Sequence, residues 1–239
     1  MKTHWALAAV AGLVLVAAGP ARAQYAAGDV ADGGSIAGTV KWAGEAPAPK
    51  KIAATKDTEV CGKKDLFDET LQVSADKGLK NAVVMLTDIK KGRKWAAEKA
   101  TLDQNGCHFV PHVTVAKVGG PVDILNSDGI LHNLHTYGTK NPAINKAQPK
   151  FKKVMTEKFD KPETFKITCD AHPWMLGWMV VSDHPYVAVT DEKGNFKLDG
   201  VPAGTYTVEI VHPGTAAKET KEVKVSAKEE AKLAVELKK

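Results

Sequence analysis

The segment from Cys169 to Met175 reads Cys-Asp-Ala-His-Pro-Trp-Met and places a thiol, an imidazole and a thioether within seven residues. A second motif, Leu-His-Asn-Leu-His at 131–135, lies upstream. If Cys169 ends a strand, the tight loop that follows can direct its histidine and methionine back to one point. Two imidazoles, a thiolate and a weak axial thioether form the ligand set of an electron-transfer copper site. The sequence therefore predicts one copper ion held by His132, Cys169, His172 and Met175.

His135 competes with His132 for the upstream position. Residues three apart on a strand face opposite sides, so only one of the two imidazoles can reach the metal. The alternative to a metal site is a buried free cysteine, a histidine in a turn and a methionine in the core. Each is common singly, but their coincidence beside a separate His-Asn pair favours copper.

The N-terminus has the features of an export signal. Lys2 precedes an apolar run at 6–18, and Ala21-Arg22-Ala23 is a small-residue cleavage site. Residues 1–23 are therefore predicted to be a signal peptide, cleaved after Ala23, that sends the protein to the periplasm. The alternative, an uncleaved anchor, conflicts with the shortness of the run, since a span needs about 20 residues. No later segment is expected to cross a membrane.

The charge balance is mildly basic, with 33 Lys and Arg against 28 Asp and Glu. This excess is too small for a nucleic-acid-binding protein but suits an acidic protein partner. Six lysines between the two motifs are candidates for steering such a partner, or else they solvate and protect a strand edge. They are Lys150, Lys152, Lys153, Lys158, Lys161 and Lys166.

The chain has three cysteines, and an odd number in an exported protein needs a reason. The simplest assignment is a disulfide between Cys61 and Cys107, with Cys169 as the metal thiolate. Alternatively, Cys61 and Cys107 are free and buried. His108 and His112 lie on one side of the same predicted strand and are either a second metal site or polar strand residues.

The pattern of apolar residues predicts an all-β protein. Alternating or continuous apolar segments bounded by turns are expected as strands at 35–42, 81–89, 109–118, 121–125, 163–169 and 177–181. Residues 90–100 are either a helix or a loop, because Gly92 and a poor apolar stripe weaken the helical pattern. Further short strands after residue 182 indicate a second, smaller β-unit.

The ligand motifs resemble those of the cupredoxins, in particular the amicyanins. The resemblance spans about residues 71–182 and implies a Greek-key β-sandwich, with Asn133 tying the two ligand loops together as an outer-shell residue. Ala171 departs from the amicyanin pattern, which has proline there. Its N–H is expected to donate to the thiolate, favour Cu(I) and raise the reduction potential.

Residues after 182 resemble the carboxypeptidase regulatory-like family. The matching segments are Val189-Thr190-Asp191, Gly194-Asn195-Phe196 and residues 201–206, with a weaker resemblance at 34–42. The expected order is thus a cupredoxin domain with an N-terminal strand extension at 24–182 and a small C-terminal β-sandwich at 183–239.

These features together predict an exported type 1 copper protein that carries single electrons and is not an enzyme. The expected partners are redox proteins such as a c-type cytochrome or a dehydrogenase, with electrons leaving through His172, whose imidazole edge is expected near the surface. Trp174 is expected either to form an apolar patch around that edge or to pack against the second unit. The alternatives are a periplasmic copper chaperone or store, and a structural β-protein. The chain lacks the paired His-x-His motifs of multicopper oxidases.

Overall fold

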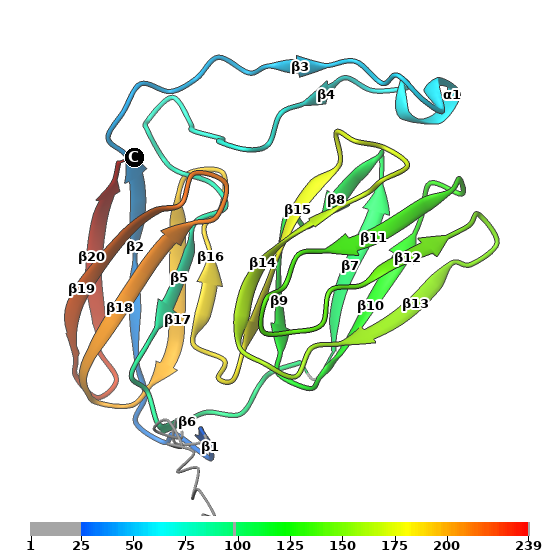
Figure 1. Ribbon diagram of the computed structural model, residues 1–239. Coiled ribbons are helices and arrows are strands. Elements are labelled where there is room, and N and C mark those ends of the chain that lie inside the picture. The colour runs from blue at the N-terminus through cyan, green and yellow to red at the C-terminus, as the bar shows by residue number, and fades with distance from the viewer. Residues whose placement is uncertain (1–24, 98, 239) are drawn as a thin grey trace, which may run out of the picture.

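The computed structural model describes residues 25–97 and 99–238, so the predicted signal peptide at 1–23 lies outside the described residues. Within them, all but one of the elements are strands, which confirms the all-β prediction. None of the described helices is long and apolar enough to cross a bilayer. The strands form two β-sandwiches that lie side by side (Figure 1).

The first sandwich, here called the site sandwich, contains the predicted ligands. One sheet has the order β13 (Val154–Lys158), β10 (Pro121–Asn126), β7 (Ala100–Asn105) and β8 (His108–Val110). The other has the order β12 (Asn145–Gln148), β11 (His132–Thr136), β14 (Glu163–Thr168), β15 (Leu176–Ser182) and β9 (Val113–Lys117). Alternate residues of these strands face inward and bury a core that includes Phe109, Ile124, Leu134 and Met179.

The second sandwich, here called the flanking sandwich, combines strands from both ends of the chain. One sheet has the order β16 (Val187–Val189), β5 (Val83–Leu86), β18 (Gly204–His212) and β19 (Ala217–Val225). The other has the order β17 (Asn195–Val201), β2 (Gly34–Trp42) and β20 (Glu230–Leu237), with β2 parallel to β20. Two small pairs complete the strands, β1 (Ala26–Ala27) with β6 (Lys91–Gly92) and β3 (Lys51–Ile52) with β4 (Leu66–Phe67).

The structure corrects the predicted domain order. The sequence predicts a cupredoxin domain with an N-terminal strand extension at 24–182, but β2 and β5 from that segment are interior strands of the flanking sandwich. The site sandwich is therefore inserted between β5 and β16 of a discontinuous unit, and residues 183–239 alone form only part of a sandwich. The apolar pattern of a strand reveals that it is buried but not which distant strand it pairs with, and this is why the sequence predicts two consecutive domains.

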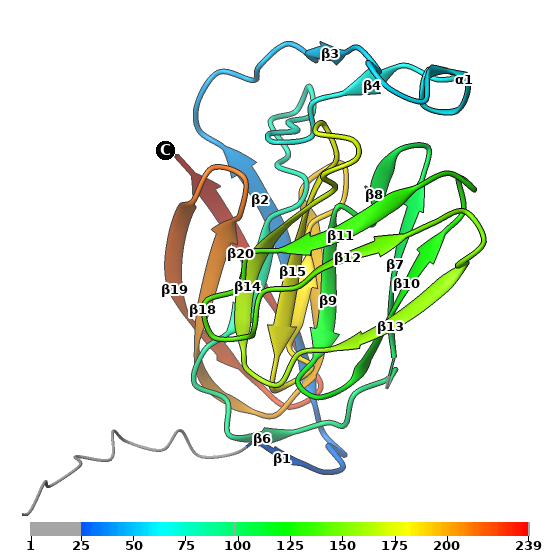
Figure 2. The same ribbon diagram turned by 45° about the vertical axis from the view of Figure 1, so that its right-hand side comes forward.

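An extended segment at 43–70, here called the arm, runs from β2 across the end of the site sandwich and returns towards β5 (Figures 1 and 2). It contains β3, β4 and the one short helix, α1 (Thr58–Cys61). Cys61 and Val60 pack into the core of the site sandwich. The predicted disulfide is confirmed, since Cys61 is bonded to Cys107 with a Cα–Cα distance of 5.4 Å. It closes a loop with a sequence separation of 46, which stabilises the fold by roughly 4 kcal/mol in a chain-entropy treatment.

Two local predictions have clear outcomes. Residues 90–97 and 99–100 contain the short strand β6 and the start of β7 but no helix, so the loop alternative holds for that segment. Residues 109–118 form two strands rather than one, because Pro111 interrupts the strand between β8 and β9.

Trp178 packs in an apolar cluster that joins the two sandwiches and includes Val83 and Val113.

Candidate metal centre

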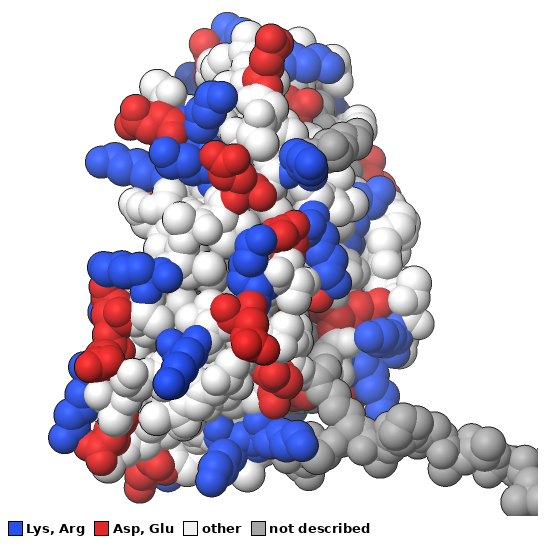
Figure 3. Space-filling view, turned by 90° about the vertical axis from the view of Figure 1, so that its left-hand side faces the viewer, with Lys and Arg blue, Asp and Glu red and all other residues white. Residues whose placement is uncertain are grey.

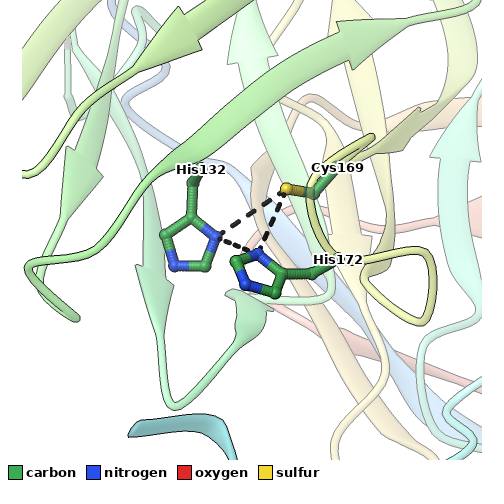
Figure 4. A group of neighbouring side chains, drawn as sticks. All are labelled: His132, Cys169 and His172. Carbon is green, nitrogen blue, oxygen red and sulfur yellow. Dashed lines mark hydrogen bonds between the residues drawn. The ribbon is translucent and has the colours of Figure 1, made fainter. Parts of the chain in front are cut away.

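Three of the four predicted ligands converge at one end of the site sandwich (Figure 4). Cys169 directly follows β14, His132 begins β11, and His172 lies in the loop between β14 and β15. The Cys169 Sγ atom lies 3.8 Å from His132 Nδ1 and 3.6 Å from His172 Nδ1. The two Nδ1 atoms are 3.1 Å apart. All three side chains are buried.

This triangle has the dimensions of a metal site. The three edge lengths define a point in the plane of the donor atoms that lies about 2.0 Å from each of them. For comparison, metal–imidazole bonds are about 2.0–2.1 Å long and a Zn–thiolate bond is about 2.3 Å long. An ion therefore fits between the donors with a shift of a few tenths of an ångström. Two nitrogens and a soft sulfur in a trigonal arrangement favour copper over the oxygen-preferring cations.

A carboxylate lies behind each imidazole. Asp128 Oδ2 is 2.9 Å from His132 Nε2, and Asp57 Oδ2 is 2.9 Å from His172 Nε2. A carboxylate accepts only, so each Nε2 carries a hydrogen and Nδ1 is the nitrogen left to bind a metal at the common point. Such carboxylate–histidine pairs fix the tautomer and raise the basicity of a ligating imidazole. Both histidines are thus arranged to bind a metal through Nδ1.

The His132 imidazole is strongly basic. Burial lowers the pKa of His132, but the hydrogen bonds with Asp128 and Cys169 outweigh burial and raise it to about 9. Burial raises the pKa of Asp128, but hydrogen bonds from His132 and from the N–H groups of Cys107 and Gly106 outweigh it and lower the pKa. Burial lowers the pKa of His172, in part opposed by Asp57. Without a metal, His132 therefore holds a proton that a bound cation must displace.

Asn133 joins the two ligand loops, as the cupredoxin resemblance implies. Its side-chain Oδ1 accepts from the backbone N–H of Asp170, and its own backbone N–H donates to Cys169 Sγ at 3.4 Å. The Ala171 N–H lies 3.4 Å from the same Asn133 Oδ1. The predicted hydrogen bond from Ala171 to the thiolate is therefore wrong, because Asn133 supplies both the acceptor for Ala171 and the donor for the sulfur.

Met175 and His135 have different positions. Met175 is buried in the same core cluster as Cys169, and its N–H donates to the His172 carbonyl at 2.9 Å. His135 lies outside the donor triangle on the other side of β11, where it contacts Asp170 at 2.9 Å and stacks on Tyr137. The alternation of side chains along the strand thus places His132 rather than His135 in the cluster.

The arm covers His172. This histidine has 0 % of its surface exposed, and Asp57 on the arm contacts its Nε2 atom. The imidazole edge expected near the surface is therefore covered by the arm, and the exit of electrons through His172 stays a prediction. Trp174 lies against the same imidazole, with a ring-centroid distance of 5.2 Å, and packs on the core of the site sandwich.

Sequence reasoning missed Asp57, which stands 115 residues before its partner. Asp57 precedes α1 at the N-cap position, but its side chain makes no capping hydrogen bond. Its backbone adopts the left-handed conformation, with φ 49°, which is unfavourable for most residues other than glycine but tolerated by Asp and Asn. The only sequence signal was an Asp before a short helix, which predicts a cap and not a contact with a histidine.

The predicted pair of histidines at 108 and 112 binds a carboxylate. Glu69 Oε2, on the arm, lies 3.0 Å from His108 Nδ1 and 3.5 Å from His112 Nδ1. Among the described residues, the two histidines do not belong to a metal-sized cluster of donors. They hold the arm to the site sandwich, close to the disulfide at Cys107.

This contact should make stability depend on pH. Burial raises the pKa of Glu69, but the hydrogen bonds from His108 and His112 outweigh it and bring the pKa to about 2, from an ordinary 4.5. The ionised carboxylate thus contributes its stabilisation above pH 4.5, and this is lost as the pH falls towards 2. We expect Glu69→Gln to destabilise the protein by about 1–3 kcal/mol at pH 6 and much less at pH 2.5, measured by urea unfolding. An equal loss at both pH values would contradict the contact.

The fold and the site define an all-β protein with two sandwiches and a buried cluster of two histidines and a cysteine. Residues 179–238 match the carboxypeptidase regulatory-like domain family, which confirms the resemblance predicted for the C-terminal part. The matched segment supplies β16 to β20 of the flanking sandwich, and β2 and β5 complete it. No curated protein matches the sequence of the chain.

Solved cupredoxin structures resemble part of the chain. A purple cupredoxin from Nitrosopumilus maritimus is 21% identical over 35% of this chain and 99% of its own, with a TM-score of 0.30. A copper-containing nitrite reductase from Thermus scotoductus is 24% identical over 35% of this chain and 22% of its own, with a TM-score of 0.31. An amicyanin variant is 24% identical over 37% of this chain and 87% of its own, with a TM-score of 0.33. These similarities are partial, and the metal centre is defined by its own side-chain geometry.

Proposed function

We propose that this chain is an exported type 1 copper protein that carries single electrons between redox partners. The observation that supports this most is the triangle of His132 Nδ1, His172 Nδ1 and Cys169 Sγ, whose edges of 3.1–3.8 Å fit one ion. Bound copper would supply one-electron redox chemistry. The protein would hold the donors in nearly the same place in both oxidation states, because both imidazoles are fixed from behind by carboxylates.

The test is a titration of the exported, metal-free protein with Cu(II), followed by optical spectroscopy and redox titration. We expect one equivalent to bind with an intense visible thiolate-to-Cu(II) band that bleaches reversibly on one-electron reduction. Binding without such a band, or a stoichiometry other than one, would contradict the proposal.

A copper store or chaperone is the second candidate, and the burial of all three donors favours it, since enclosure slows the release of an ion. The Cu(II) form separates the two functions. A store would bind Cu(I) without a stable Cu(II) form, whereas an electron carrier would cycle repeatedly between Cu(I) and Cu(II).

Met175 is proposed as the weak axial ligand, which tunes the potential without being needed for binding. Met175→Leu conserves volume in the buried site, so the fold should persist. We expect the variant to retain one copper and its visible band while its reduction potential rises, because a thioether stabilises Cu(II) more than an alkyl group does. An unchanged potential, measured by redox titration, would remove Met175 from the ligand set.

A further inference from the structure

The covering of His172 raises the question of where a redox partner approaches the site. His172 Nε2 is bound by Asp57, and no part of the residue is exposed. The other nitrogen ligand, His132, is buried too, but its neighbour Leu131 is exposed. One backbone route from the donor triangle to the surface therefore runs from His132 to Leu131.

Two adjacent loops form an apolar and basic surface around Leu131. One is the turn between β10 and β11, and the other is the loop at 149–153 between β12 and β13 (Figures 1 and 2). Together with Val154, which begins β13, they contribute three of the six exposed large hydrophobic side chains of the described residues, and Phe151 is 81 % exposed. We call this surface the Phe151 patch; it consists of Leu131, Lys150, Phe151, Lys152, Lys153 and Val154.

The charge of the Phe151 patch is unbalanced. Lys150, Lys152 and Lys153 are exposed, and none of their ammonium groups forms an ion pair with a residue that the structure describes. The nearby Asp128 is already engaged by His132. By contrast, the outer face of the flanking sandwich intersperses both signs (Figure 3) and pairs Lys218 with Glu209.

The loop that presents Phe151 is held in place from below. The Gln148 side chain, which is fully buried, donates to the Lys152 carbonyl at 3.1 Å. The Asn126 N–H donates to the Lys153 carbonyl at 2.9 Å, and the Asn126 side chain donates to Ile130 in the adjacent turn. Both loops are thus fixed to one buried asparagine, so little conformational entropy is lost when a partner binds.

We infer that the Phe151 patch is the docking surface for an acidic redox protein, with Phe151 as the apolar anchor and the three lysines as the steering charges. This inference rests on the proposed electron-transfer function. The other exposed aromatic close to the site, Tyr137, is already occupied. His135 stacks on its ring, and Lys166 lies 4.4 Å from the ring centroid.

The test measures stopped-flow electron exchange between the copper-loaded protein and a soluble c-type cytochrome of net negative charge. We expect replacement of Lys150, Lys152 and Lys153 by glutamine to lower the second-order rate constant by about tenfold at low ionic strength and to flatten its salt dependence. Phe151→Ala should also slow the exchange. Both variants should keep the visible band, because the substituted side chains are exposed and lie outside the donor triangle.

Two controls keep the inference falsifiable. Replacement of Lys218, Lys221 and Lys232 by glutamine changes the net charge equally on the flanking sandwich and should have little effect. Tyr137→Ala tests the other exposed aromatic. Equal slowing by both triple variants, or slowing by Tyr137→Ala and not by Phe151→Ala, would overturn the docking surface.

A phosphatidylglycerol vesicle provides the last comparison. If the patch variants lose binding to such vesicles but exchange electrons with the cytochrome at the wild-type rate, the patch binds a membrane and the inference is wrong. Fast exchange that no variant alters also overturns the docking surface but leaves the proposed function intact. A wild-type protein with neither a visible band nor electron exchange overturns both.

Discussion

Replacement of Cys169 by serine should abolish the visible band completely. The band requires charge transfer from a thiolate to Cu(II), and a serine hydroxyl offers neither the soft donor nor the low-energy transition. Because Cys169 Sγ is one of three donors around a single point, copper affinity should fall by more than about 100-fold, beyond what loss of an outer-shell partner causes. Optical titration and competition with a chelator measure both effects.

The control for this prediction is His135→Ala. His135 lies only a few residues from His132 but contacts Asp170 and Tyr137 instead of the donor triangle. The variant should keep the band and the stoichiometry of one. If His135→Ala bleaches the site while Cys169→Ser does not, the ligand set is wrong.

The local part of the site could be predicted from the sequence. Cys169 and His172 are three residues apart, so one short loop after a strand brings them together whatever the rest of the chain does. The alternation of side chains on a strand allows only one of His132 and His135 to reach the metal, and the resemblance to cupredoxins selects His132, the histidine before Asn133. The pairing of Cys61 with Cys107 follows from export and an odd cysteine.

The non-local part could not be predicted. The parallel pairing of β2 with β20 joins residues near opposite ends of the chain, and the apolar pattern of either strand fits several partners. The same limit applies to the contact of Asp57 with His172, since the aspartate lies on an arm whose path depends on the insertion of one sandwich into the other. His172 is covered by that arm, and the ligand motif alone does not predict the cover.

Asp57→Asn should weaken copper binding and raise the reduction potential of the bound copper. The substitution preserves the local backbone, because Asn tolerates both the left-handed conformation and the N-cap position. It removes the negative charge that Asp57 places 2.9 Å from His172 Nε2 and thereby lowers the basicity of the ligand. Loss of such an outer-shell partner weakens metal binding by about 10–100-fold.

The weakening should fall mainly on Cu(II), which depends more than Cu(I) on donation from imidazole nitrogen. A selective loss of that size corresponds to a rise in potential of about 60–120 mV for a one-electron couple. Asp65→Asn is the matched control, because Asp65 is an exposed arm carboxylate that pairs with Lys51. Redox titration of both variants measures the two potentials. A potential that falls in Asp57→Asn, or shifts equally in Asp65→Asn, would show that the arm covers His172 without acting on the metal.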